Sequence, residues 1–299
     1  MQTSPLPLVA LAVLAAALSS PLAAAEAKLR VAAVQLRSTA RLADNVAAIQ
    51  RALAECAARR VQVAVFPECA VSSYFPAAIL ALSPAELAAA EAEIAAACRA
   101  HGVAAVVGVP ERRDGRWYNC ALVIDGSGRT VTRYDKAQLV GGDRSWQCVA
   151  GDEPPPVFTL AGVPATVNIC HDSRYPELAR LPVLAGARVI FYLSHESAIA
   201  KESKMGPYRA QVQARAVENN VFVVHANAPA DTHDTGSHGQ SRVVEPDGNV
   251  RQEASIFGEE ILVAELDLAQ ATRERALASL QGPLADWWRA ALPRVRVVP

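Results

Sequence analysis

The stretch VNICHDSRYPE, residues 167–177, joins an apolar strand to a thiol and then to a turn that opens a helix. Such a corner places Cys170 at the edge of a sheet, where the N-terminus of the following helix favours a thiolate. A nucleophile is expected in this position, although a cysteine that ends a buried strand is more often a plain core residue. The stretch by itself therefore predicts a strand-to-helix unit and leaves two interpretations of Cys170.

Strands and helices alternate on the N-terminal side of this stretch. The apolar pattern predicts strands at 29–36, 61–66 and 104–109 and helices at 43–59 and 83–101. The second helix has a clear start, because Ser83-Pro84-Ala85-Glu86 combines an N-cap, a proline at the first helical position and a capping-box glutamate. Glycine turns at 113–115 and 125–128 flank a strand at 117–124, so antiparallel pairing enters the same sheet.

The alternation resumes after a proline-rich loop at 152–156. Further strands are expected at 164–169, 189–193 and 221–226, with a helix at 205–219. Mixed sheets whose helices cover only one face leave the other face apolar, and two such sheets can bury those faces against each other. Because no internal linker, repeat or low-complexity segment interrupts this part of the sequence, we expect one α/β domain over residues 28–299.

Two charged residues also follow apolar strands. Glu68 comes after the second strand, with Tyr74 and Phe75 close behind, and a half-desolvated carboxylate can act as a base near neutral pH. Lys136 directly follows a strand at 131–135, in a chain in which only Lys28, Lys136, Lys201 and Lys204 of the 29 basic residues are lysines. A compact ammonium suits a developing oxyanion, but a solvated lysine at a strand end is the alternative interpretation.

Taken together, Pro67-Glu68, YDKAQL at 134–139 and ICHDSRYPE at 169–177 resemble the Glu-Lys-Cys triad of the nitrilase superfamily, the carbon-nitrogen hydrolases. The resemblance covers nearly all of the chain beyond about residue 28. Four weaker segments support it, at 29–36, 118–125, 214–219 and 241–248. It implies a four-layer αββα sandwich and a reaction that needs no metal and no organic cofactor.

The resemblance also implies a role for each member of the triad. Cys170 would attack the carbon of an amide, a carbamoyl group or a nitrile, and Glu68 would move the protons. Lys136 and the backbone N–H of His171 would hold the negative oxygen of each tetrahedral intermediate. Members of the family commonly carry a second glutamate after the lysine segment. The only acid in the matching stretch is Asp143, one methylene shorter, which makes it the candidate for that position.

The same resemblance places the substrate pocket around Tyr74, Asn119, Arg174, Tyr175 and His195.

Other conspicuous residues have plainer interpretations. His233, Asp234 and His238 could bind a metal, but loop residues beside glycine are usually solvated, and four well-spaced ligands are not evident. The sequence also lacks a Gly-x-Ser-x-Gly nucleophile elbow, which makes a serine hydrolase a poor alternative.

The N-terminus reads as an export signal over residues 1–25. An apolar stretch from Leu8 to Leu18 precedes Ala23-Ala24-Ala25, a small-residue cleavage site. No Lys or Arg precedes Lys28, so an uncleaved anchor from Leu6 to Ala25 is the alternative. We expect an exported protein, periplasmic or secreted.

Export conflicts with a free catalytic thiol, because an oxidising compartment favours disulfides. The chain has six cysteines, and if Cys170 stays free at least one other must also be unpaired. A bridge between Cys56 and Cys98 is conceivable, but we prefer to interpret both as small buried hydrophobic residues.

The charge and the aromatic residues of the chain bear on its binding partners. The net charge of -1 gives no reason to expect nucleic acid or an anionic membrane surface. The adjacent Trp287 and Trp288 would be sticky if exposed, so they are expected to pack on the chain's own surface or on a second subunit of a homodimer or higher homo-oligomer.

The sequence therefore favours an exported amidase or N-carbamoyl-amide hydrolase that releases ammonia from a small molecule through a cysteine thioester. A nitrilase or an amide-forming acyltransferase with the same triad is the nearest alternative. A partner-binding module that kept the fold without catalysis is a further alternative, which the intact Glu68, Lys136 and Cys170 argue against.

Overall fold

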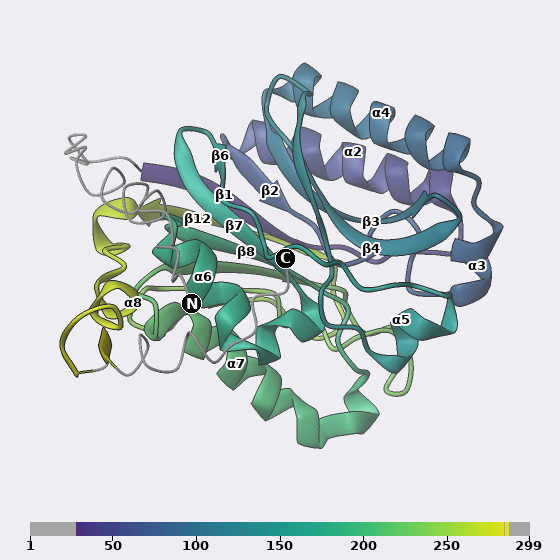
Figure 1. The fold of residues 1–299 in the computed structure, drawn as a ribbon. Helices are drawn as coiled ribbons and strands as arrows, with labels where there is room; N and C mark the ends of the chain where they lie inside the picture. The colour runs from purple at the N-terminus through teal and green to yellow at the C-terminus, as the bar shows by residue number, and fades with distance from the viewer. Residues whose placement is uncertain (1–27, 284, 287–299) are drawn as a thin grey trace, which may run out of the picture.

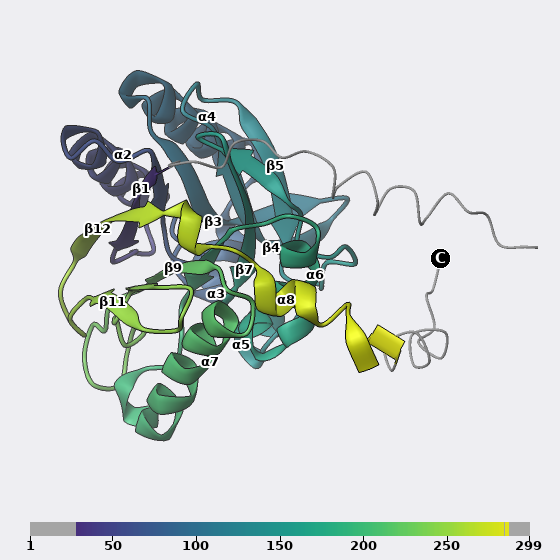
Figure 2. The same ribbon diagram turned by 90° about the vertical axis from the view of Figure 1, so that its left-hand side faces the viewer.

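Two six-stranded mixed sheets lie face to face, and helices cover the outer face of each sheet (Figure 1). The computed structural model describes residues 28–283 and 285–286. Helices α2 and α4 lie outside one sheet, and α6 and α7 lie outside the other (Figure 2). The four-layer αββα sandwich expected from the sequence is confirmed.

The first sheet has the strand order β12-β1-β2-β3-β4-β5. Its strands are β1 (Lys28–Gln35), β2 (Val63–Val65), β3 (Ala104–Arg113), β4 (Arg116–Ile124), β5 (Thr130–Asp135) and β12 (Glu260–Asp267). The helices of this half are α2 (Leu42–Ala58), α3 (Pro76–Ala81), α4 (Pro84–His101) and α5 (Gly141–Ser145).

The second sheet has the strand order β11-β10-β9-β8-β7-β6. Its strands are β6 (Phe158–Leu160), β7 (Val163–Ile169), β8 (Val189–Ser194), β9 (Phe222–Asn227), β10 (Arg242–Val244) and β11 (Val250–Glu253). The helices of this half are α6 (Pro176–Leu184), α7 (Met205–Val217) and α8 (Glu274–Ala278), with the short 3-10 helices η1 (Cys170–Arg174), η2 (Ile199–Lys204) and η3 (Leu268–Gln270).

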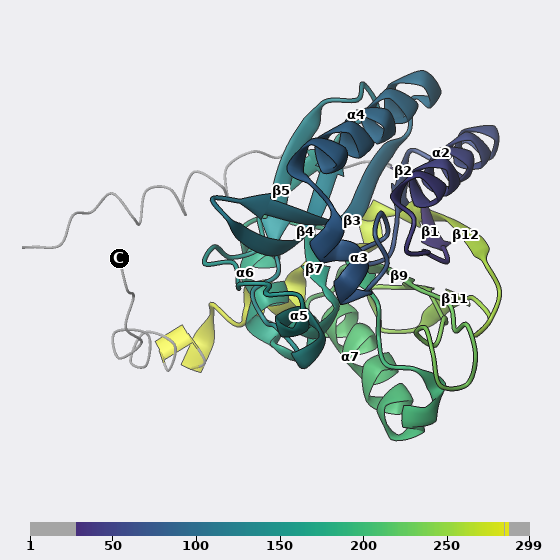
Figure 3. The same ribbon diagram turned by 90° about the vertical axis from the view of Figure 1, so that its right-hand side faces the viewer.

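Parallel strands occupy the middle of each sheet, and antiparallel strands complete its edges. Strands β1, β2 and β3 are parallel in the first sheet, and β7, β8 and β9 are parallel in the second. The carboxyl ends of neighbouring parallel strands open onto one edge of a sheet, where ligands bind in many α/β proteins. The segments that follow β2, β7 and β8 meet at this edge, and α3 and α5 lie beside it (Figure 3).

Aliphatic side chains from both sheets fill the space between them. Val65 and Val106 of the first sheet face the same inaccessible layer as Val167 and Phe191 of the second. Apolar burial contributes about 25 cal/mol per Å² removed from water, so this layer is the main stabilising element of the fold.

Most expected elements occur close to their predicted positions, and Ser83 and Glu86 form the predicted capping box of α4. The strand expected at 61–66 is shorter, because only Val63–Val65 is extended in the ladder. Strand β12 was not expected from the sequence; it pairs with β1 along its whole length, with Lys28 opposite Asp267.

Several predictions concern residues outside the described range, namely the export segment at 1–25, the anchor alternative at 6–25, and Trp287 and Trp288. Among residues 28–283, 285 and 286, no helix is long and apolar enough to cross a membrane. All six cysteines are free and buried, which agrees with the preferred interpretation of Cys56 and Cys98.

Candidate active site

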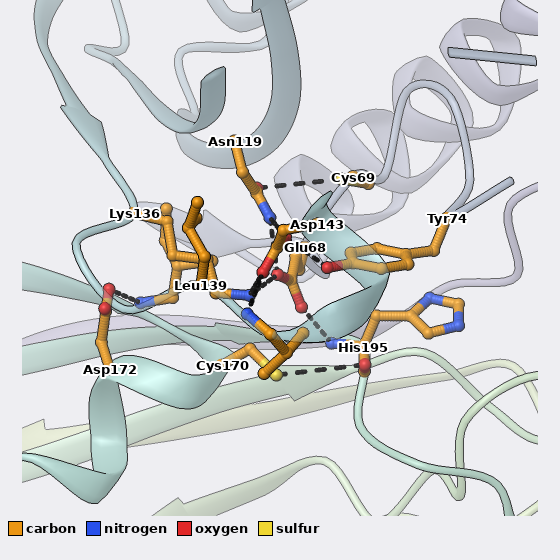
Figure 4. Close-up of polar contacts among 12 residues, drawn as sticks. Glu68, Cys69, Tyr74, Asn119, Lys136, Leu139, Asp143, Cys170, Asp172 and His195 are labelled. Carbon is orange, nitrogen blue, oxygen red and sulfur yellow. Dashed lines mark hydrogen bonds and ion pairs between the residues drawn. The ribbon is translucent and has the colours of Figure 1, made fainter. Parts of the chain in front are cut away.

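Glu68, Lys136 and Asp143 form a buried ion-pair cluster at the edge where the two sheets meet (Figure 4). Lys136 Nζ lies 2.6 Å from Glu68 Oε1 and 2.9 Å from Asp143 Oδ2, and the three side chains have no solvent exposure. The ammonium therefore bridges two carboxylates. A solvated strand-end lysine, the alternative interpretation of Lys136, is wrong.

Glu68 lies in the turn directly after β2, where Gly108 of β3 lets the backbone approach closely. A Cβ atom at residue 108 would lie 2.3 Å from the carbonyl oxygen of Pro67. Glu68 Oε1 accepts a hydrogen bond from Asn119 Nδ2 at 2.7 Å, and Oε2 accepts one from the backbone N–H of His195 at 2.9 Å. The carboxylate is thus fully buried rather than half-desolvated, and both oxygens have donors.

The charges in this cluster shift one another's pKa values. Burial raises the pKa of Glu68, and the lowering effect of Lys136 only partly offsets it. Burial alone would lower the pKa of Lys136, but Glu68, Cys170 and Asp143 together raise it well above its usual value. Lys136 therefore stays protonated, and a carboxyl group with a raised pKa is suited to accept and return a proton near neutral pH.

Asp143 occupies the place beside Lys136 that the sequence left open. The short helix α5 begins just before it, and the backbone N–H of Val140 donates to Asp143 Oδ2 at 2.8 Å. The hydroxyl of Tyr74 donates to Asp143 Oδ1, and Asn119 Nδ2 donates to the same oxygen at 2.9 Å. Burial opposes ionisation, but Lys136 and these hydrogen bonds hold the pKa of Asp143 below its usual value.

Cys170 lies at the end of β7 with a positive φ of 46°. A left-handed conformation costs a non-glycine residue about 1–2 kcal/mol, so the corner must be held by its surroundings. Burial and the charge of Glu68 raise the pKa of the thiol well above its usual value. This direction favours a neutral thiol in the resting site over the expected thiolate, and the following helix η1 has only five residues.

Asp172 holds the Cys170 corner from one side, and sequence reasoning missed it. Its carboxylate accepts hydrogen bonds from the backbone N–H groups of Ile169 at 3.2 Å and Gln138 at 2.9 Å and from the hydroxyl of Tyr134 at 2.9 Å. Because Tyr134 and Gln138 flank Lys136 in the sequence, this carboxylate ties the lysine segment to the thiol corner. Burial raises the pKa of Asp172 to about 7.

A cavity of about 550 Å³ opens above Cys170. Arg174, Lys201 and Lys204 contribute positive charge to its wall, and Glu196 is the acid among its described side chains. His171 also lines it, so the backbone expected to supply an oxyanion donor is next to the cavity.

The predicted pocket residues divide into two groups. Arg174 and His195 line the cavity, and Tyr74 stacks on the His195 ring at 5.4 Å and forms part of a neighbouring cavity of about 270 Å³. Asn119 is a correction, because its side chain is buried behind Glu68 instead of in the wall. Tyr175 is a second correction; it is 38% exposed and contacts the His171 ring edge-on outside the cavity.

The histidines and acids considered as metal ligands lie in different surroundings. His233 is exposed and pairs with Asp234, as expected of a solvated loop, but His238 is completely buried against Glu196. Within the described part of the chain, only Glu111, Cys120 and Asp135 bring three possible ligand atoms within 4.8 Å of one another. Arg113 and Arg133 form ion pairs with these two acids, so the charge that would attract a cation is already neutralised.

Comparisons with known proteins agree with the geometry. The family model described as carbon-nitrogen hydrolase matches residues 30–276. The chain is 30% identical to the omega-amidase of Danio rerio over 257 residues, covering 81% of this chain and 89% of that protein. It is also 30% identical to the 2-oxoglutaramate amidase of Bacillus subtilis (strain 168) over 219 residues, covering 73% and 82%.

A shorter sequence match and a solved structure point to the same family. The chain is 32% identical over 160 residues to the "hydrolase in agr operon" of Staphylococcus lugdunensis and spans 66% of its length. A structure of a variant amidase from Nesterenkonia sp. AN1, with the acetamide moiety of fluoroacetamide covalently added at its active-site cysteine, superposes with a TM-score of 0.75 and 25% identity, covering 89% of this chain and 95% of that one. The chain therefore belongs to the carbon-nitrogen hydrolase family, within the nitrilase superfamily.

Proposed function

We propose that the protein hydrolyses the terminal amide of small molecules that carry a carboxylate at their other end, releasing ammonia. The observation that carries this proposal is the fully buried cluster of Glu68, Lys136 and Asp143 beside the Cys170 corner, under a cavity with a basic wall. Acyl transfer through a thioester needs a thiol nucleophile, a carboxyl group that accepts and returns protons, and a fixed cation that stabilises the oxyanion.

In the first half of the reaction, Glu68 takes the proton of the Cys170 thiol as the sulfur attacks the amide carbon. The carbonyl oxygen becomes negative and is met by the Lys136 ammonium and the backbone N–H of His171. The tetrahedral intermediate collapses when Glu68 returns the proton to the leaving nitrogen, so ammonia departs and a thioester remains.

In the second half, water replaces ammonia. Glu68 takes a proton from the water as its oxygen attacks the thioester carbon, and the same two donors hold the second oxyanion. Collapse of this intermediate breaks the carbon–sulfur bond, and Glu68 gives the proton to the thiolate. The products are a carboxylic acid and the regenerated thiol, and none of these steps uses a metal or an organic cofactor.

The substrate class follows from the charge of the cavity. Arg174, Lys201 and Lys204 face the space above Cys170, and cationic side chains stabilise a carboxylate there. The names of two relatives, an omega-amidase and a 2-oxoglutaramate amidase, support a substrate of this kind. N-carbamoyl amino acids carry a carboxylate as well and form the second candidate class.

A matched set of four small molecules tests the proposal. Ammonia release is measured for succinamate, its neutral counterpart succinamide, N-carbamoylglycine and 3-cyanopropanoate. We expect kcat/KM for succinamate to exceed that for succinamide by about 10- to 100-fold, because one well-placed ion pair separates them. Equal rates for the two amides would refute the carboxylate requirement, and faster turnover of the carbamoyl compound or the nitrile would reassign the reaction.

Arg174 is the first side chain to change in this test. Arg174→Gln removes charge from the cavity wall, so we expect kcat/KM for succinamate to fall while that for succinamide stays within about twofold. Arg116→Gln, at the exposed start of β4, is the matched control and should leave both unchanged.

We also propose that the chain is exported and that its mature form begins near Glu26 or Lys28. The apolar stretch followed by Ala23-Ala24-Ala25 supports this. N-terminal sequencing of protein from the native host decides it, and an intact Met1 in a soluble cytoplasmic fraction would refute it. Assembly into a homodimer or higher homo-oligomer is proposed with it and is measured by light scattering.

A further inference from the structure

A row of polar side chains crosses the outer face of the second sheet, beneath α7. Tyr192 of β8, His225 of β9 and Arg242 of β10 are neighbours in register, and each is 2% exposed or less. Ile190 and Val223 lie on the same face within an apolar cluster. Burying ionisable groups on such a face costs free energy, so these side chains need interactions or a function that offset the cost.

Glu196 and His238 lie beside this row, with Glu196 Oε1 3.9 Å from His225 Nε2, and both side chains are inaccessible. His238 Nδ1 lies 3.0 Å from the carbonyl oxygen of Ser197, and Nε2 lies 3.0 Å from Glu196 Oε2. Although burial opposes ionisation, the contact with His238 holds the pKa of Glu196 below its usual value, so the Glu196 carboxylate stays charged inside the protein.

Tyr192, at the β8 end of the row, contacts the backbone of Cys170. The hydroxyl of Tyr192 lies 2.8 Å from the carbonyl oxygen of Cys170, 2.9 Å from Ser173 Oγ and 3.2 Å from Glu196 Oε1. The Tyr192 ring stacks on His225 at 4.5 Å, which fixes its plane. The single hydroxyl proton is shared by the Cys170 carbonyl oxygen and the Glu196 carboxylate, and Ser173 Oγ can donate to the hydroxyl oxygen, so Tyr192 links the strained backbone to the buried charge.

We propose that Tyr192 is a positioning residue, oriented by the buried Glu196–His238 pair, that holds Cys170 in the left-handed conformation from which its thiol reacts. The proposal rests on the nucleophilic role given to Cys170 above. Asp172 holds the N–H side of the corner, and Tyr192 holds its carbonyl side, so the two supports act from opposite directions.

The main experiment measures the reactivity of the thiol as well as turnover. For Tyr192→Phe we expect kcat on succinamate and the rate of Cys170 alkylation by iodoacetamide both to fall about tenfold, with KM within about twofold, because one hydrogen bond is lost and tenfold corresponds to roughly 1.4 kcal/mol. Tyr118→Phe on β4 of the other sheet is the matched control, expected to leave both rates unchanged. Alkylation does not depend on the substrate, so a wrong substrate class leaves this readout intact.

A second variant tests whether Glu196 acts through Tyr192. Glu196→Gln keeps the shape but removes the charge, and we expect a loss in alkylation rate of about threefold. In the Tyr192→Phe background the same change should have no further effect, whereas independent actions would multiply. Wild-type alkylation in folded Tyr192→Phe, or full multiplication in the double variant, would overturn the proposal. If Tyr192→Phe does not fold, an unchanged alkylation rate in Glu196→Gln refutes it alone.

Discussion

The two corners to which we assign the reaction lie at the meeting edge of the sheets, and they are built differently. The carboxylate corner after β2 is fixed by close backbone packing against Gly108 and by donors to both Glu68 oxygens. The thiol corner after β7 keeps Cys170 in a strained conformation, and side-chain hydrogen bonds from Asp172 and Tyr192 hold it. The carboxylate corner is rigid because its backbone packs closely against β3. The thiol corner is rigid because hydrogen bonds offset the strain of the Cys170 backbone.

Because of this difference, substitutions at the two corners should affect the stability of the fold and the reaction rate to different extents. Changes at the carboxylate corner must displace backbone, so they should disturb folding as well as catalysis. Changes at the thiol corner remove a reacting atom or one hydrogen bond, so they should alter the rate more than the fold. The following predictions test this separation, beginning with the largest expected effect.

Cys170→Ala gives the cleanest loss of rate without loss of fold. We expect kcat/KM to fall by at least about 10⁴-fold, because the nucleophile is absent, with little change in the melting temperature. Ammonia release and thermal unfolding measure the two quantities, and Cys170→Ser should behave alike. Cys56→Ala, which removes a buried thiol under α2, is the control and should remain active. Retention of most activity without Cys170 would rule out the triad.

Lys136 lies between the two corners. Its replacement by arginine keeps the positive charge and changes the shape of the cation, so it tests which of the two the site requires. We expect Lys136→Arg to be nearly as damaging as Lys136→Ala, at about 3 kcal/mol in the barrier, because loss of an oxyanion donor typically costs that much. The planar guanidinium would also lock Glu68 in a bidentate pair. Near wild-type kcat/KM in Lys136→Arg would contradict the oxyanion role.

Gly108→Ala tests the backbone packing of the carboxylate corner. The added Cβ would lie 2.3 Å from Pro67 O and 2.4 Å from Cys69 N, and neither backbone atom can move without shifting Glu68. We expect a loss of about 2–3 kcal/mol in the free energy of unfolding together with reduced activity. Denaturant unfolding measures the first effect. Gly206→Ala, in the first turn of α7, is the control for steric conflict, since its φ is not positive and nothing lies within 4 Å of its Cβ position. A stable and active Gly108→Ala would show that the corner is not held by backbone contact.

Asp172→Asn produces the smallest effect and one that depends on pH. An amide can replace only part of the three accepted hydrogen bonds, so we expect a loss of about 1–2 kcal/mol in the barrier. Burial raises the pKa of Asp172 to about 7 in the folded state, above its unfolded value. Its contribution to stability is therefore complete at pH values below about 4 and declines as pH rises through 7.

The pH dependence of the free energy of unfolding checks this sign. Relative to Asp172→Asn, the wild-type protein should lose stability between pH 5 and pH 8. A gain over that interval would show that the hydrogen bonds to Asp172 outweigh its burial.

Local patterns predicted most of the individual strands and helices, and the family resemblance implied the four layers. Glu68, Lys136 and Cys170 each follow an apolar strand, and the resemblance grouped them into one site. The sequence could not show which far segments become neighbours. The register of β8, β9 and β10 decides that Tyr192, His225 and Arg242 form one row, and pairing register is not encoded in any single stretch.

Two pocket residues were misplaced for a related reason. Asn119 lies in a strand whose side chains alternate between faces, and the orientation of β4 against β5 turned it behind Glu68. Tyr175 follows η1, and the direction in which that turn leaves the corner is set by Asp172, whose bonds span 34 and 38 residues. Asp172 itself offered a signal, since an acid two residues after a nucleophile in a turn can accept from the backbone before it.

The pairing of β1 with β12 has a consequence for the order in which the molecule can form. The first strand of the domain meets its antiparallel neighbour only at residues 260–267, more than 220 positions later in the chain. Contacts of such sequence separation form slowly, because a long loop must close before they stabilise anything. One edge of the first sheet therefore stays open during synthesis until almost the whole domain has left the ribosome, and the last strand to emerge closes it.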